Sequence, residues 1–226
     1  ILCLILIFHV RERVLLEKAL RANPALLDQH RDRSEMTLER PLLLITGDSR
    51  AKDLGTTKIG RFHVENRGIA GQTTTEVLAR VGRDMAILRP DQVIVIAGIN
   101  DLKISSADGE EPTQAAAALM EILAIGEAMN IPVTLLEAWG ASESITLRGM
   151  FLPSHLASAV RALNLKITKM KRPESARIAS TNAILNDNDL VRAELARDAL
   201  HLNDRGLDIL RKLILESLDG EKTDTN

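Results

Sequence analysis

The chain has 226 residues, with 29 Lys and Arg against 31 Asp and Glu and a formal net charge of −2. Its hydrophobic fraction of 45% and charged fraction of 27% are typical of globular proteins, which excludes fibrous, collagen-like and wholly disordered classes. The balanced charge and the aromatic content of 2% argue against a nucleic-acid partner, because such proteins normally carry a basic excess and stacking aromatics. We therefore expect one compact domain with an appendage.

The first 40 residues differ from the rest. The apolar run at residues 1–8 is shorter than the roughly 20 residues that span a bilayer. Because the sequence does not begin with Met, one interpretation of this run is the end of a truncated membrane anchor or signal segment. An anchor of this kind would attach the protein to a membrane or the cell envelope. The other is an apolar helix packed on the domain. An amphipathic pattern follows until Asn23-Pro24, and a polar linker fills residues 28–40.

From residue 41 onward, short apolar runs alternate with longer helical patterns. The pattern predicts strands at residues 42–45, 62–65, 92–97, 132–136 and 176–179 and helices at 74–88, 113–129, 156–170 and 207–218. Continuous apolar strands separated by helices are typical of a parallel sheet that is buried on both faces. We expect a doubly wound α/β domain over residues 41–220 and a frayed tail at 221–226.

Four loops in this pattern carry the polar residues of interest. Gly47-Asp48-Ser49-Arg50 follows the first strand, residues 66–73 follow the second, and Gly98-Ile99-Asn100-Asp101 follows the third; the fourth, Asp198-Ala199-Leu200-His201, precedes the last helix. Ligands of open parallel sheets bind beyond the carboxyl ends of the strands, so these loops predict one shared site. Together they supply a hydroxyl, glycine turns, an amide, a carboxylate and an imidazole, which is the set that acyl transfer requires.

Each residue type has a chemical reason. A serine hydroxyl needs a base to become nucleophilic, and His201 is the histidine in such a loop with a carboxylate beside it. Asp198 is expected to bond one ring nitrogen of His201 and leave the other to face Ser49. The N–H groups of Ser49 and Gly71 and the amide of Asn100 are candidate donors to an oxyanion.

These blocks resemble the four signature blocks of the SGNH (GDSL) hydrolase superfamily over about residues 41–215. The resemblance implies a three-layer α/β/α flavodoxin-like sandwich with a five-stranded parallel sheet. It also implies catalytic roles for Ser49, Asp198 and His201 and an oxyanion hole formed by Ser49, Gly71 and Asn100. Relatives with similar second and third blocks often carry a membrane-anchoring N-terminal helix. The chain departs from the pattern at Arg50, where an apolar residue is common, and at Leu202, where Pro is frequent.

The predicted function is a serine esterase that hydrolyses a small acyl ester, with a small-molecule, glycan or lipid substrate. An O-acyltransferase with the same residues is one alternative, and a non-catalytic ligand-binding module is another. Structural roles are expected for Asp48 and Asp101, which brace their loops, and packing or solvation is preferred over substrate contact for Trp139 and Arg148.

The sequence predicts neither a cofactor nor a metal ion. The single cysteine, Cys3, cannot form an intramolecular disulfide or a Cys-based zinc site. The remaining histidines, His9, His30, His63 and His155, lack metal-ligand spacing, and no phosphate-loop or dinucleotide fingerprint occurs.

Overall fold

The computed structural model describes residues 40–103, 110–142, 152–186 and 189–219. The predicted apolar segment, its linker up to residue 39, Arg148 and the tail at 221–226 therefore lie outside the described residues. Within the described ranges, no helix is both long enough and apolar enough to cross a membrane.

One sheet forms the centre of the domain, with its strands in the order β2-β3-β1-β4-β5-β6. Its parallel strands are β1 (Leu42–Gly47), β3 (Phe62–Gly68), β4 (Gln92–Ile96), β5 (Val133–Leu136) and β6 (Arg177–Ala179). These five strands confirm the predicted parallel sheet. The order of the strands reverses beside β1, which pairs with β3 on one side and β4 on the other. Such a reversal is where open α/β sheets bind their ligands.

The sheet also has a sixth strand that the sequence pattern did not predict. This strand, β2 (Lys58–Ile59), has two residues and pairs antiparallel with the start of β3. Its apolar signal is a single buried side chain, Ile59, so a pattern of periodic burial cannot detect it. The turn into β3 passes through Gly60 at φ 54°, a left-handed conformation that favours glycine.

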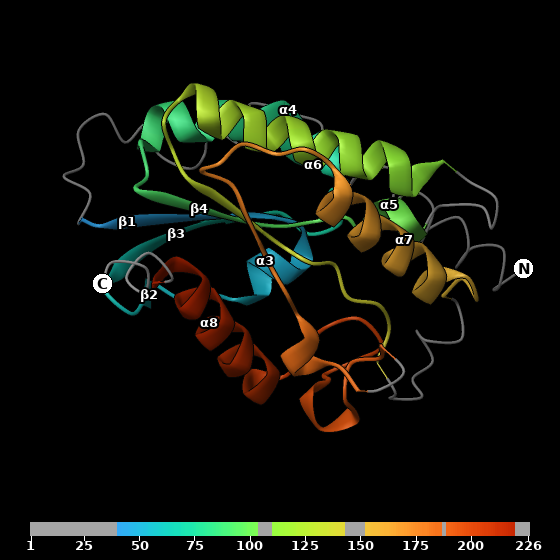
Figure 1. Cartoon of the computed structure of the whole chain (residues 1–226). Helices are drawn as coiled ribbons and strands as arrows, with labels where there is room; N and C mark the ends of the chain where they lie inside the picture. The colour runs from blue at the N-terminus through green and yellow to red at the C-terminus, as the bar shows by residue number, and fades with distance from the viewer. Residues whose placement is uncertain (1–39, 104–109, 143–151, 187–188, 220–226) are drawn as a thin grey trace, which may run out of the picture. The chain divides into compact units, whose positions relative to one another are not determined.

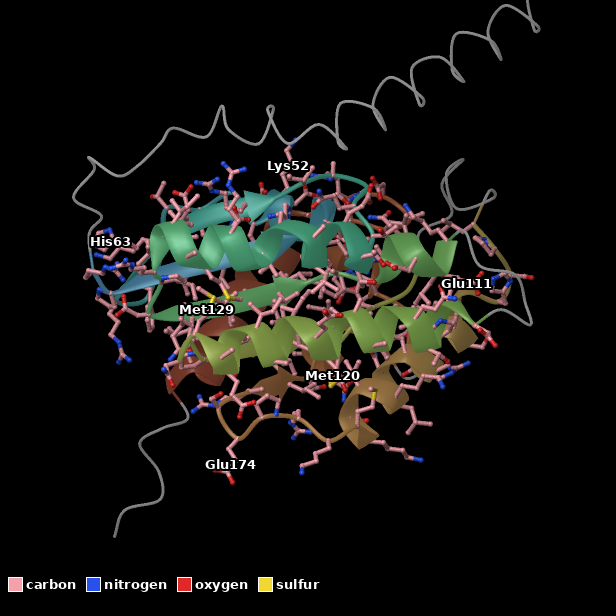
Figure 2. All side chains as sticks on the ribbon, turned by 90° about the horizontal axis from the view of Figure 1, so that it is seen from above. Lys52, His63, Glu111, Met120, Met129 and Glu174 are labelled. Atoms are coloured by element: carbon pink, nitrogen blue, oxygen red, sulfur yellow. The ribbon has the colours of Figure 1, made fainter. Side chains whose placement is uncertain are left out.

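Helices cover both faces of the sheet (Figure 1). On one face lie α4 (Thr74–Leu88), α5 (Ile99–Lys103), α6 (Glu111–Ala128) and α7 (Leu156–Lys169), with α6 packed between α4 and α7. Figure 2 shows α4 and α6 side by side over the sheet. On the other face lie the short α3 (Ser49–Asp53) and the closing α8 (Asp204–Asp219). The three-layer α/β/α sandwich is confirmed.

Alternate residues of the central strands supply the two cores. In β1, Leu42 and Leu44 pack with α4, α6 and α7, whereas Leu43 and Ile45 pack with α3 and α8. All four side chains are at most 2% exposed. A strand buried on both faces reads as a continuous apolar run, which explains why the sequence predicted β1 so clearly.

Candidate active site

The turn from β1 into α3 presents Ser49 at the carboxyl edge of the sheet. Gly47 has φ 141°, and a Cβ there would lie 1.9 Å from the carbonyl oxygen of Ile96, so no other residue fits. Asp48 is the N-cap of α3, and its Oδ1 accepts from the N–H of Arg50 at 2.8 Å. Ser49 is therefore the first residue of the helix, held by a capped turn. The predicted bracing role of Asp48 agrees with this bond.

The structure brings Ser49, His201 and Asp198 together. Ser49 Oγ and His201 Nε2 lie 3.0 Å apart, and His201 Nδ1 lies 2.9 Å from each carboxylate oxygen of Asp198. Both contacts are within hydrogen-bond distance. Because Asp198 is an acceptor, Nδ1 carries the ring proton and Nε2 is left to accept from the Ser49 hydroxyl.

The surroundings set the charges of this group. Burial lowers the pKa of His201 below its ordinary value of 6.5, and the neighbouring Asp198 offsets the effect only in part. Burial alone would raise the pKa of Asp198, but hydrogen bonds from the N–H of Leu200 and from His201 lower it to about 2. At neutral pH the site thus holds a neutral imidazole beside an ionised carboxylate.

The loop after β3 carries Gly71. It is tied to the end of β1, because the N–H of Ile69 donates to the carbonyl of Gly47 at 3.0 Å. Gly71 has φ 80°, a left-handed backbone conformation that favours glycine. Among the described residues, no acceptor is found for the N–H of Gly71 or for that of Ser49. Within the described ranges, both N–H groups are available for the predicted oxyanion role.

Asn100 joins this loop from the end of β4. It is 6% exposed, and its Nδ2 donates one hydrogen bond to the carbonyl of Gln72 at 2.8 Å. A side-chain amide has two N–H donors, and within the described part of the chain the second one is available for the predicted oxyanion role. Asp101 accepts from both the N–H and the hydroxyl of Thr74, at 3.0 and 2.7 Å, and thereby locks the two loops together. The predicted bracing role of Asp101 agrees with these bonds.

Arg80 supports the same loop and was missed by the sequence analysis. It lies on the buried side of α4 and is 6% exposed. Its guanidinium donates to Gln72 Oε1 at 2.9 Å, to Asp84 Oδ2 at 2.8 Å and to the carbonyl of Gly47 at 3.3 Å. One sequence signal could have found this residue: Arg80 lies on the apolar face of the predicted helix, four residues before the carboxylate of Asp84.

The residue after the serine is also buried. Arg50 is 4% exposed, and its guanidinium stacks 4.3 Å from the centre of the Trp139 ring. Trp139 is itself only 1% exposed, so its expected packing role agrees with its burial. The guanidinium of Arg50 and the surrounding core residues pack against the ring.

One cavity of about 440 Å³ lies beside this site rather than at it. It is bounded by the loop after β5, by α7 and by the segment after β6, and its lining includes Trp139, Asn164 and Leu185. Neither Ser49 nor His201 lines it. Within the described ranges, no cluster of three or more His, Cys, Asp and Glu side chains is arranged to hold a metal ion.

The fold and the site place the protein in a class: α/β hydrolytic enzymes with a serine, a histidine and an aspartate at the carboxyl edge of a parallel sheet. The model of the GDSL-like lipase/acylhydrolase family matches residues 46–209, which include Ser49, Gly71, Asn100, Asp198 and His201. The chain belongs to this family, and it is an ester-hydrolysing enzyme. No curated protein matches it.

Solved structures share the fold at low sequence identity. A GDSL-like lipase from Bacteroides thetaiotaomicron has a TM-score of 0.71 and 18% identity, over 88% of this chain and 98% of that one. The acetyl xylan esterase AlAXEase has a TM-score of 0.62 and 19% identity, over 78% and 99%. A catalytic mutant of an acetylxylan esterase from Geobacillus stearothermophilus has a TM-score of 0.58 and 19% identity, over 84% and 100%.

Proposed function

We propose that the protein is a serine esterase that removes a short acyl group from an alcohol through an acyl-enzyme intermediate. The observation that carries this proposal is the continuous chain of contacts from Ser49 Oγ through His201 to Asp198, at 3.0 and 2.9 Å. A serine hydroxyl paired with a neutral imidazole, whose other nitrogen bonds a carboxylate, is the arrangement that activates a nucleophile.

Acylation uses the three side chains in sequence. His201 Nε2 takes the proton of Ser49 Oγ as the oxygen attacks the ester carbonyl, and Asp198 stabilises the imidazolium that forms. The imidazolium then protonates the alcohol oxygen as the ester C–O bond breaks. The acyl group remains on Ser49. Asp198 stays ionised throughout, which agrees with its pKa of about 2.

Deacylation repeats these steps with water. His201 takes a proton from the water as it attacks the acyl carbon, and the imidazolium returns that proton to Ser49 Oγ when the acid leaves. In both steps the carbonyl oxygen becomes an oxyanion. The N–H groups of Ser49 and Gly71 and the second amide N–H of Asn100 are the donors that we assign to it.

The names of two structural neighbours support a short acyl group. Both are described as acetylxylan esterases, and both share the fold of this chain. Acetyl esters on a glycan are therefore the substrates that we place first.

A series of p-nitrophenyl esters from acetate to laurate tests the proposal. We expect kcat/KM to be highest for acetate or butyrate and to fall as the chain lengthens, and we expect acetate release from acetylated xylan. Product analysis with an added sugar acceptor separates hydrolysis from transfer. Absence of hydrolysis for every ester by the wild-type protein would overturn the assignment.

A further inference from the structure

The guanidinium of Arg50 is buried directly beside the serine. It donates to three main-chain carbonyls, those of Leu200 at 3.2 Å, Trp139 at 2.5 Å and Gly140 at 3.0 Å. The aromatic face of Trp139 covers the same group at 4.3 Å. An arginine that is 4% exposed and bonded in this way has lost its water, so its hydrogen bonds fix its position.

These carbonyls belong to two loops that are distant in sequence. Trp139 and Gly140 lie in the loop after β5, whereas Leu200 directly precedes His201. Arg50 itself follows Ser49 at the start of α3. One side chain therefore connects the backbone beside the hydroxyl with the backbone beside the imidazole.

A second contact joins the same two loops without Arg50. Ser142 donates from its hydroxyl to the carbonyl of Asp198 at 3.0 Å and from its N–H to the carbonyl of Ala199 at 2.9 Å. The loop after β5, here called the platform loop, is thus hydrogen-bonded directly to the Asp198–His201 loop. Arg50 connects the platform loop, through its bonds to Trp139 and Gly140, to the helix that begins at Ser49.

We propose that Arg50 is a positioning residue that clamps the His201 loop to the start of α3 and keeps the imidazole within hydrogen-bond distance of Ser49. The inference rests on the proposed function and on the three carbonyl bonds of Arg50. An apolar side chain here could pack on Trp139, but it could not bond the three carbonyls.

The charge of Arg50 makes a second contribution. The charged groups that act on His201 are Asp198 and Asp53, which favour its protonated form, and Arg50, which opposes it. Asp53 is also bridged by Arg197 at 2.8 Å. Burial lowers the pKa of Arg50 to about 10, so it stays charged at neutral pH. Its charge helps to keep His201 neutral and able to accept a proton.

Arg50→Lys and Arg50→Met separate the two contributions. Lysine keeps the charge but cannot bridge three carbonyls in the fork of a guanidinium, whereas methionine fills the space without charge or donors. The matched control is Arg177→Met, at an arginine that also donates to a carbonyl, that of Ser217, at the other end of the sheet. Circular dichroism and thermal melting give the folded fraction, and kcat is expressed per folded molecule.

We expect kcat to fall by about 10- to 100-fold in both Arg50 variants and to stay unchanged in Arg177→Met, because a small misplacement of a base is costly. The pH midpoint of kcat/KM should rise in Arg50→Met and stay in place in Arg50→Lys. A wild-type kcat per folded molecule in both variants, or an unmoved midpoint in Arg50→Met, would overturn the proposal.

A failure of the underlying function has a different signature. Wild-type protein that neither hydrolyses an ester nor reacts with a fluorophosphonate would overturn both proposals together. Wild-type protein that does both, with Arg50 variants that match it in rate and pH profile, would overturn the role of Arg50 alone.

Discussion

Ser49 and His201 are 152 positions apart in the chain, and their Oγ and Nε2 atoms lie 3.0 Å apart in the fold. The sheet explains this proximity. β1 lies at its centre, so α3 begins at the middle of the carboxyl edge, and the segment before α8 packs across α3 on the same face. The hydrogen bond is therefore a product of the topology and of the clamps that hold the two loops, and it has several testable consequences.

Replacing Asn100 by Ala should slow turnover. The change removes a donor next to Gly71, and losing one oxyanion donor typically lowers kcat by about 10²–10³-fold. KM should change little, because the donor is needed mainly in the transition state. Steady-state kinetics on a short p-nitrophenyl ester measures both values.

Asn164→Ala is the matched control for that variant. Asn164 also braces a loop with its amide, accepting from the N–H of Ala138 at 2.9 Å and donating to its carbonyl at 2.8 Å. It should cost stability but leave kcat per folded molecule nearly unchanged. Equal kcat values for the two variants would contradict an oxyanion role for Asn100.

Arg80→Met should loosen the loop that carries Gly71. The variant leaves Gln72 Oε1 without its donor and removes one of the two donors to the carbonyl of Gly47, which should lower the free energy of unfolding by about 1–3 kcal/mol. We also expect kcat to fall about tenfold or more, because a small displacement of an oxyanion donor is costly. Urea unfolding and kinetics measure the two effects. Arg83→Met, at an exposed residue of the same helix, should reproduce neither.

Activity should depend on the protonation of His201. The protonated imidazole cannot accept the Ser49 proton, so kcat/KM should rise with pH through the pKa of His201 and then reach a plateau. Because burial lowers that pKa, the midpoint should lie below 6.5. Asp198, with a pKa of about 2, should contribute no step above pH 4. A pH profile on an ester with a pH-independent leaving group checks this, and a flat profile between pH 4 and 8 would argue against an imidazole base.

Asp48 should make stability depend on pH in the opposite sense from an ordinary carboxylate. Burial raises its pKa from 3.8 to about 6, so the folded state binds its proton more tightly than the unfolded state does. Its contribution is present below pH 3.8 and is lost as pH rises through 6, a change of about 3 kcal/mol at about 1.4 kcal/mol per pKa unit.

Asp48→Asn tests this relation, since an asparagine can still accept from the N–H of Arg50 and cap α3. Urea unfolding at a series of pH values should show the wild type losing stability relative to the variant between pH 4 and 7. The contribution of His201 is present in both proteins and cancels in the comparison. Parallel stability curves for the two proteins would contradict an elevated pKa.

Much of the fold follows from local patterns. The apolar stripe from Val77 to Leu88 and the proline at position 90 predicted the bounds of α4, and the structure adds a capping box between Thr73 and Glu76 at its start. Asp198 and His201 are three residues apart, so their contact could also be expected. β2 could not, because two residues carry no periodicity.

The supporting contacts could not be predicted because they join backbone groups of distant loops. Arg50 bonds the carbonyls of Trp139 and Leu200, which lie 89 and 150 positions further along the chain. Carbonyl groups occur at every residue, so no side-chain pattern marks those that will be partners. The sequence shows only that a charged residue follows Ser49.

The central claim is that Ser49 is the nucleophile, and mass spectrometry after reaction with a fluorophosphonate tests it most directly. We expect one adduct on the wild-type protein, located by peptide mapping at Ser49, and none on Ser49→Ala, which should retain the thermal stability of the wild type. An unlabelled wild type, or a Ser49→Ala variant that still takes up one equivalent of the reagent, would contradict the account.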